Sequence, residues 1–189
     1  RACVAAERGT AHRMTILVPA VPLRAERYEP HGAVIAAAGA PDRRANQGTA
    51  QVWDDFPPLE NARGEAAPAR VSVYRCTPLA GRRLALRVLE RHPCSTQLFV
   101  PLGPARYLVV VAGAGPAPAL ERLAAFVVDG PRAITYAPGT WHHPMVALDR
   151  PTDFVNVLHA DGGPEDCDER VFEPPLAVVE VPAPSQKPR

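Results

Sequence analysis

The chain has 189 residues, of which 47% are hydrophobic and 22% are charged, and its formal net charge is +1. A chain of this length can bury about 70% of its unfolded surface in one domain. Because 21 basic and 20 acidic side chains nearly cancel, we expect no partner of nucleic acid or anionic membrane. No hydrophobic run reaches the roughly 18 residues that a membrane-spanning helix requires, so we expect no such helix.

Residue usage narrows the chemistry further. The chain contains 23 prolines, and because proline breaks helices, this content favours strands joined by turns. Lysine occurs only at Lys187, so a Schiff-base or P-loop lysine within the domain is excluded. The four cysteines are widely spaced and form no CxxC pair. We therefore expect reduced thiols in a cytoplasmic protein rather than a zinc ribbon or a disulfide scaffold.

The two ends of the chain differ in character from the part between them. Residues 1–13 are basic and lack the apolar core of a secretory signal. We interpret them as a leader or untranslated segment, with organellar targeting as the alternative. Met14 opens an apolar stretch, so we place a single domain at residues 14–181. Residues 182–189 are rich in proline, and we expect them to form a disordered tail.

Between these ends, short strand-forming segments alternate with Gly/Pro turns. The predicted strands, in chain order, are Ala33–Ala37, Val71–Arg75, Leu84–His92, Thr96–Val100, Tyr107–Gly113, Ala133–Tyr136 and Phe154–His159. Only Ala119–Val127 has the pattern of a short helix. Many short strands at this spacing are typical of an antiparallel sandwich or barrel. The predicted fold class is therefore all-β, with one or two short helices.

The predicted strand at Leu84–His92 is the most informative of these segments. Side chains alternate between the two faces of a strand, which places Glu90 and His92 at the end of an apolar row that points inward. We expect the opposite row, which includes Leu89 and Arg91, to face solvent. A buried carboxylate and imidazole are costly unless they are paired. A Glu–His hydrogen bond at a barrel rim and a functional site both meet this requirement.

Two motifs in the right order extend this pair into a candidate site. The spacing Glu90-x-His92-x4-Gln97 resembles the first motif of the cupin superfamily. The segment PGTWH, which ends at His142, resembles the second; His143 is the wrong neighbour, since adjacent side chains on an extended segment face opposite ways. The four matching side chains offer two nitrogens and two oxygens, a set that suits one divalent transition metal. A metal-free polar site built from the same residues is the alternative.

Longer blocks of the sequence resemble one family. They are NQGTA at 46–50, LERHP at 89–93 followed by STQLFVPL at 95–102, and GTWHHP at 139–144. On these blocks the chain is similar to the ureidoglycolate lyases. The resemblance implies a cupin-like double-stranded β-helix, usually a homodimer, that splits ureidoglycolate into glyoxylate and urea in allantoin and purine breakdown. A dependence on a divalent metal is also associated with this family.

The resemblance and the chemistry together assign catalytic roles. Ureidoglycolate carries a hydroxyl, a carboxylate and a ureido nitrogen on one carbon, so its cleavage removes one proton and delivers another. Without a metal, Glu90 or His92 is the expected proton acceptor and His142 the donor. With a metal, these residues become ligands, and His143 or Asp168 is left to move the proton.

The substrate-binding residues that the resemblance implies are Asn46, Gln47, Gln97 and His143. Asn46 and Gln47 supply amides suited to urea or carboxylate oxygens, although an ordinary Asn/Gly turn has the same local sequence. Gln97 alternatively caps a strand end, and His143 alternatively lies behind the site or in a dimer contact. Two other functions stay open: a hydrolase that releases ammonia from ureidoglycolate, and a non-catalytic cupin that binds a small acid.

Overall fold

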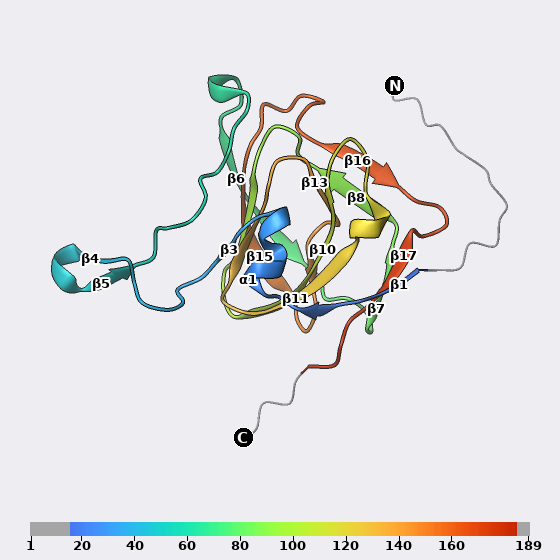
Figure 1. Cartoon of the computed structure of the whole chain (residues 1–189), viewed down its shortest axis with the longest axis horizontal. Coiled ribbons are helices and arrows are strands. Elements are labelled where there is room, and N and C mark those ends of the chain that lie inside the picture. The colour runs from blue at the N-terminus through green and yellow to red at the C-terminus, as the bar shows by residue number, and fades with distance from the viewer. Residues whose placement is uncertain (1–15, 185–189) are drawn as a thin grey trace.

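The computed structural model describes residues 16–184, and this part of the chain is built mainly from strands (Figure 1). The leader expected at residues 1–13 and the tail residues 185–189 lie outside the described residues. Within the described part, α-helix is confined to one turn, α1 (Ala25–Tyr28), and no helix is long and apolar enough to cross a membrane. The 3₁₀ turns are η1 (Glu29–His31), η2 (Asn46–Gly48), η3 (Gly64–Ala66) and η4 (Leu120–Arg122). The all-β prediction is confirmed.

Two sheets form the walls of a barrel. The larger contains, in spatial order, β16 (Asp168–Val171), β8 (Val88–Arg91), β13 (Thr140–His142), β10 (Ala105–Ala114), β11 (Ala124–Gly130) and β2 (Val21–Pro22), and β14 (Val146–Ala147) also pairs with β10. The other contains β3 (Val34–Ile35), β12 (Ala133–Tyr136), β9 (Gln97–Pro101), β15 (Thr152–His159) and β6 (Ala69–Cys76). Strands far apart in the sequence, such as β8 and β13, pair directly, as expected for a cupin-like fold.

The inner faces of these two sheets enclose an aromatic core. Tyr107 and Val109 of β10 lie there with Phe99 of β9 and Phe154 of β15. The rings of Tyr107 and Phe154 pack edge to face, with centroids 5.1 Å apart, a geometry that contributes about 0.5–1.5 kcal/mol beyond the burial of area. This core holds the two walls together and thereby fixes the strands that carry the site.

A third sheet covers the outer face of the larger wall. It consists of β1 (Ile16–Pro19), β17 (Ala177–Glu180) and β7 (Arg83–Leu86), with β1 and β17 parallel. Strand β10 therefore lies between two cores: Val109 and Val111 belong to the inner core, whereas Leu108 and Val110 belong to the outer one. Burial on both faces explains the continuous apolar run in this part of the sequence.

The strand expected at Leu84–His92 is in fact two strands in different sheets. β7 ends at Leu86, and β8 begins two residues later, so the chain passes at Arg87 from the third sheet into the larger wall. The prediction that the row containing Leu89 faces solvent is wrong, because Leu89 is completely buried in the outer core. The third sheet supplies a second apolar surface that the alternation by itself does not reveal.

The helix expected at Ala119–Val127 is also wrong. Only the 3₁₀ turn η4 forms there, and β11 begins at Ala124. Neighbouring side chains of β11 enter different cores, Phe126 the inner one and Val127 the outer one. A strand that is buried on both faces lacks the polar–apolar alternation that identifies a half-buried strand, so periodicity cannot distinguish it from a buried helix.

One segment leaves the barrel. Residues 37–54, which we call the arm, contain a hairpin of β4 (Arg43–Ala45) and β5 (Ala50–Val52) joined by η2. Figure 1 shows the arm projecting from the side of the barrel that carries β3 and β6, away from β8, β13 and β16. Two predicted substrate-binding residues, Asn46 and Gln47, lie at its tip.

Candidate active site

Glu90 and His142 lie opposite each other on paired strands. β8 and β13 place His142 in register with Glu90, and His142 Nε2 lies 3.5 Å from Glu90 Oε1, which is longer than a normal hydrogen bond. His92 directly follows β8, and its ring centroid lies 5.7 Å from that of His142. One donor atom from each of these three residues lies within 4.8 Å of the others. The structure thus brings the three predicted catalytic side chains together.

Backbone carbonyls fix the tautomer of both imidazoles. His92 Nδ1 lies 2.7 Å from the carbonyl oxygen of Asp166, and His142 Nδ1 lies 2.8 Å from that of Thr140. A carbonyl oxygen only accepts, so each Nδ1 donates and each neutral ring keeps a bare Nε2. Both Nε2 atoms are buried, and neither has a hydrogen-bond partner among the described residues. Two nitrogen lone pairs are therefore available beside a carboxylate.

Gln97 adds a buried oxygen from the other wall. It is the first residue of β9 and is 3% exposed, and its Oε1 has no hydrogen-bond partner within the described part of the chain. Imidazoles oriented by carbonyl oxygens, together with a carboxylate, form a donor set that divalent transition metals accept. The residues fit such an ion: Glu90, His92 and His142 can converge on it, and Gln97 stays a predicted fourth ligand.

Tyr136 is a site residue that the sequence analysis missed. Its ring stacks on the His142 imidazole, with centroids 3.8 Å apart and planes 8° apart. It pairs with Gln97 across β12 and β9, and its hydroxyl is buried without a hydrogen-bond partner in the described residues. Burial raises the pKa of Tyr136 well above its usual value, so the group stays a proton donor. Its place three residues before the Gly139 turn was the available signal.

Burial and mutual contacts set the charges of the cluster. Burial raises the pKa of the Glu90 carboxyl, but the contact with His142 and the electrostatic interactions with the neighbouring imidazoles bring it below its usual value. Burial lowers the pKa of His92 and that of His143. At neutral pH an ionised carboxylate therefore lies beside neutral rings of His92 and His143. A neutral ring with a bare Nε2 is the form that accepts a proton.

A distant ion pair holds His92 in place. The Asp166 carboxylate accepts the backbone N–H of Gly162 at 2.6 Å and that of Asp161 at 3.2 Å, and it pairs with Arg63. The side chains of Arg63 and Asp166 are only 13% and 15% exposed. Since the Asp166 carbonyl receives the His92 Nδ1–H, this pair orients the imidazole. The two partners are 103 residues apart, so no local spacing predicts their contact.

The other predicted residues fall into two groups. His143 is half-buried near the cluster, and its Nδ1 donates to a backbone carbonyl at 2.7 Å. The Asp168 carboxylate lies 2.6 Å from Arg91 Nη2, so it is engaged in an ion pair rather than with the cluster. Asn46 and Gln47 are exposed at the tip of the arm. In a single chain the structure does not bring these two amides to the imidazoles.

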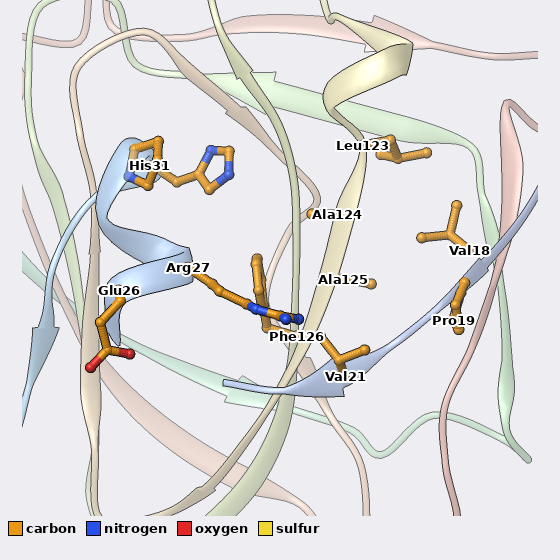
Figure 2. Close-up of a pocket in the computed structure, with 11 residues that line it drawn as sticks. Val18, Pro19, Val21, Glu26, Arg27, His31, Leu123, Ala124, Ala125 and Phe126 are labelled. Carbon is orange, nitrogen blue, oxygen red and sulfur yellow. The ribbon is translucent and has the colours of Figure 1, made fainter. Parts of the chain in front are cut away.

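A separate hollow lies between α1, β1, β2 and β11 (Figure 2). Its volume is about 560 Å³, and most of its lining residues are apolar. Arg27 extends from α1 toward Phe126, and buried His31 also contributes to the wall (Figure 2). None of the predicted site residues lines this hollow. Convergent titratable groups therefore place the candidate active site at the ends of β8 and β13.

A cupin-like barrel with two bare imidazole nitrogens and a carboxylate at one point defines a small-molecule enzyme of acid–base or metal-assisted type. The particular family is shown by sequence comparison. The chain belongs to the ureidoglycolate lyase family, whose sequence model matches residues 15–179. The resemblance noted from the motif blocks is thereby confirmed, and the protein is a lyase.

Individual relatives support this membership over most of the chain. A ureidoglycolate lyase from Burkholderia cepacia is 39% identical over 163 residues, which cover 85% of this chain and 89% of the relative. One from Pseudomonas fluorescens (strain SBW25) is 36% identical over 152 residues, with 80% and 89% covered. One from Pseudomonas aeruginosa (strain LESB58) is 34% identical over 151 residues, with 80% and 88% covered.

Proposed function

We propose that the protein cleaves ureidoglycolate into glyoxylate and urea, as a carbon–nitrogen lyase. The observation that carries this proposal is the cluster of Glu90, His92 and His142 in a chain that belongs to the ureidoglycolate lyase family along nearly its whole length. The cluster supplies a carboxylate and two imidazoles, and no lysine lies in the body of the domain. The reaction forms no imine, so it needs no lysine.

Cleavage of this carbinolamide is a pair of proton transfers around one breaking bond. The substrate hydroxyl loses its proton, its oxygen forms the carbonyl of glyoxylate, and the C–N bond breaks with its electron pair on the ureido nitrogen. The bare Nε2 of His92 is the proposed proton acceptor, with Glu90 as the alternative. His142, whose Nε2 faces the Glu90 carboxylate, is the proposed donor to the departing nitrogen in its imidazolium form, in which Nε2 also carries a proton. The proton that His92 takes from the substrate hydroxyl returns His142 to this form after each turnover. Positioned groups of this kind typically contribute about 10²–10⁴-fold each.

The same side chains can alternatively hold a divalent metal. Such an ion, held by Glu90, His92, His142 and Gln97, would polarise the substrate hydroxyl and hold the substrate carboxylate. In that case the two imidazoles no longer carry protons, and His143 is the nearby group with a free ring nitrogen. Asp168 is a weaker candidate, because Arg91 holds its carboxylate.

Substrate binding is proposed for Gln97, His143, Asn46 and Gln47. Gln97 presents its buried amide oxygen beside Tyr136, which suits the N–H groups of the ureido end. Asn46 and Gln47 can contact a substrate only when the arm moves or when a second copy supplies it, because they lie at the arm tip.

We also infer the pathway, the compartment and the oligomeric state of the protein. The protein acts in allantoin and purine nitrogen breakdown, as the family name suggests. It works in the cytoplasm, which is supported by the free thiols of Cys76, Cys94 and Cys167, since reducing compartments keep cysteines unpaired. It forms a homodimer.

The decisive experiment is to incubate the purified protein with racemic ureidoglycolate and to measure glyoxylate, urea and ammonia separately. We expect glyoxylate and urea in equal amounts and no ammonia. Ammonia in place of urea would contradict the lyase reaction and indicate the hydrolase. Binding without turnover would indicate a small-acid-binding protein instead.

A further inference from the structure

The outer face of the smaller wall carries an exposed aliphatic cluster. β15 lies between β6 and β9, so that Val155 is paired with Val73 on one side and with Val100 on the other. Val157 is paired in the same way with Val71 and Leu98. The cluster, which we call the outer patch, consists of Val71, Val73, Leu98, Val100, Leu102, Val155 and Val157. Val71 is 71% exposed and Val73 61% exposed. Scattered exposed aliphatic residues are ordinary, but a cluster in register across three strands marks an interaction surface.

The free edge of the same sheet is a second surface that a partner can cover. Among the described residues β6 pairs only with β15, so one side of this eight-residue strand has unpaired backbone groups. Natural proteins usually protect such edges with charges, prolines, bulges or a covering segment. The charged side chains of β6 lie toward its two ends: Arg70 donates to the Ala160 carbonyl at 3.2 Å, and Arg75 bonds Asp153 at 2.8 Å. The edge and the patch are therefore open to another chain.

The arm leaves the barrel beside this surface, and its hairpin projects away from the barrel (Figure 1), whereas Trp53 at its base is half-buried. Its hydrogen bonds are internal: Arg43 Nε donates to Asp54 at 2.7 Å, and the Asp42 carboxylate accepts from the backbone of Asp54 at 2.8 Å. The register of β4 and β5 puts Ala45, Ala50 and Val52 on one face of the hairpin, with Arg43 at its border opposite Val52. An isolated two-stranded hairpin is at best marginally stable in water, so this small apolar face calls for a surface to pack on.

The area of the outer patch indicates that the patch and the arm act together. The patch spans about 10 Å across three strands and about 13 Å along β9, from strand spacing and rise. That footprint is well below the roughly 800 Å² per partner of a stable interface. The arm supplies the missing area when it lies on the neighbouring molecule.

We propose that the outer patch and the arm form the interface with a second copy of this chain, each arm lying on the partner. A two-fold pair matches an aliphatic patch with itself, and a net charge of +1 creates little repulsion between copies. Figure 1 shows that the patch strand β6 and the arm lie on the same side of the barrel. The inference rests on the homodimer of the proposed function and is independent of the proposed reaction.

The first test is the mass in solution, measured by light scattering after size exclusion at tens of micromolar protein. We expect twice the chain mass for the wild type and the single chain mass for Val71→Asp/Val73→Asp. Val171→Asp is the matched control, since Val171 is 71% exposed on β16 in the other wall, and it should stay dimeric. Circular dichroism checks that each variant folds. Leu102→Asp, at a 60% exposed position, tests the same patch independently if the double variant misfolds.

The second test is limited digestion with trypsin, which cuts after Arg43 and Arg44 in the arm. Both residues are exposed in the single chain. We expect slow cleavage there in the wild type and in Val171→Asp, and at least about 10-fold faster cleavage in Val71→Asp/Val73→Asp, identified by fragment mass. A monomeric wild type, or a dimeric double variant, would overturn the interface. Equal cleavage rates would overturn the part assigned to the arm. Neither readout uses turnover, so a failure of the ureidoglycolate assay is separate.

Discussion

At the scale of single residues, the two bare Nε2 atoms determine what the site can do. In both His92 and His142, Nδ1 donates to a backbone carbonyl and Nε2 is left for chemistry. Alanine at either position therefore removes a proton carrier or ligand that no neighbour replaces. We expect His92→Ala and His142→Ala each to lower kcat at least about 100-fold. The control is Glu173→Gln, an exposed carboxylate paired with Arg87, which should keep the wild-type rate. Near-normal rates in both histidine variants would refute the site.

The same two residues allow a test of metal binding that does not require turnover. After chelation, addition of Zn²⁺ or Mn²⁺ at about 100 times Kd should stabilise the wild type by about 2.7 kcal/mol, which corresponds to a Tm increase of roughly 5–10 °C. The double variant His92→Ala/His142→Ala should show no increase. Full activity after chelation, with no thermal shift in the wild type, would leave only the metal-free acid–base scheme.

The substitution Tyr136→Phe should affect activity and stability in opposite directions. Its buried hydroxyl has no hydrogen-bond partner among the described residues, so Tyr136→Phe should raise the free energy of unfolding by about 1 kcal/mol. If the hydroxyl contacts substrate, the same change lowers kcat at least about 10-fold. Tyr107→Phe is the matched comparison, because the Tyr107 hydroxyl donates to the Arg132 carbonyl at 2.7 Å, and it should destabilise by about 1 kcal/mol. Urea denaturation and steady-state kinetics measure both effects, and unchanged kcat in Tyr136→Phe would assign Tyr136 to packing alone.

At the scale of elements, the loop that contains Asp166 orients the His92 imidazole. Asp166→Asn leaves Arg63 and two backbone N–H groups with a poorer acceptor, so we expect a loss of about 1–3 kcal/mol in stability and a drop of roughly 10-fold in kcat. Glu180→Gln removes an exposed partner of Arg83 and should change neither. A normal kcat with lowered stability would show that the ion pair supports the loop but not the imidazole.

The pH dependence of this variant follows from the same contacts. Burial raises the pKa of Asp166, but hydrogen bonds from Arg63 and from backbone N–H groups bring it below its usual value. The stability that it contributes is therefore complete above the unfolded pKa of about 3.9. It is lost as the pH falls through the lower pKa of the folded state. Denaturation at pH 7 and at a series of pH values falling below about 3.9 should show the full difference between wild type and variant at pH 7 and its progressive loss as the pH falls.

At the scale of the whole molecule, three sheets create two cores that share the larger wall. Leu89 is completely buried in the outer core, so Leu89→Ala should cost about 2–5 kcal/mol in the free energy of unfolding. If its strand row faced solvent, the cost would stay within about 0.5 kcal/mol. Val171→Ala, at a 71% exposed position, provides that reference value. Chemical denaturation of both variants distinguishes the two arrangements.

Much of the site could be predicted because its signals are local. The spacing of Glu90 and His92 reflects strand periodicity, and the PGTWH turn fixes which face His142 occupies. Gln97 begins the separate strand β9 and was identified by its motif spacing instead. The family resemblance depended on the same contiguous blocks. Strand positions were also predictable wherever β-prone runs ended at glycine or proline, as at Ala133–Tyr136, which forms β12 with the same bounds.

The sequence by itself determined the donor atoms of the site, their order along the chain, the all-β class and the family. The tertiary structure decided which strands are neighbours, and with that the contacts between residues far apart in the chain. Arg63 meets Asp166, Tyr136 stacks on His142, and a third sheet buries the face of Leu89. No local pattern in the sequence predicts these contacts, because each arises only when separate elements bury surface against one another.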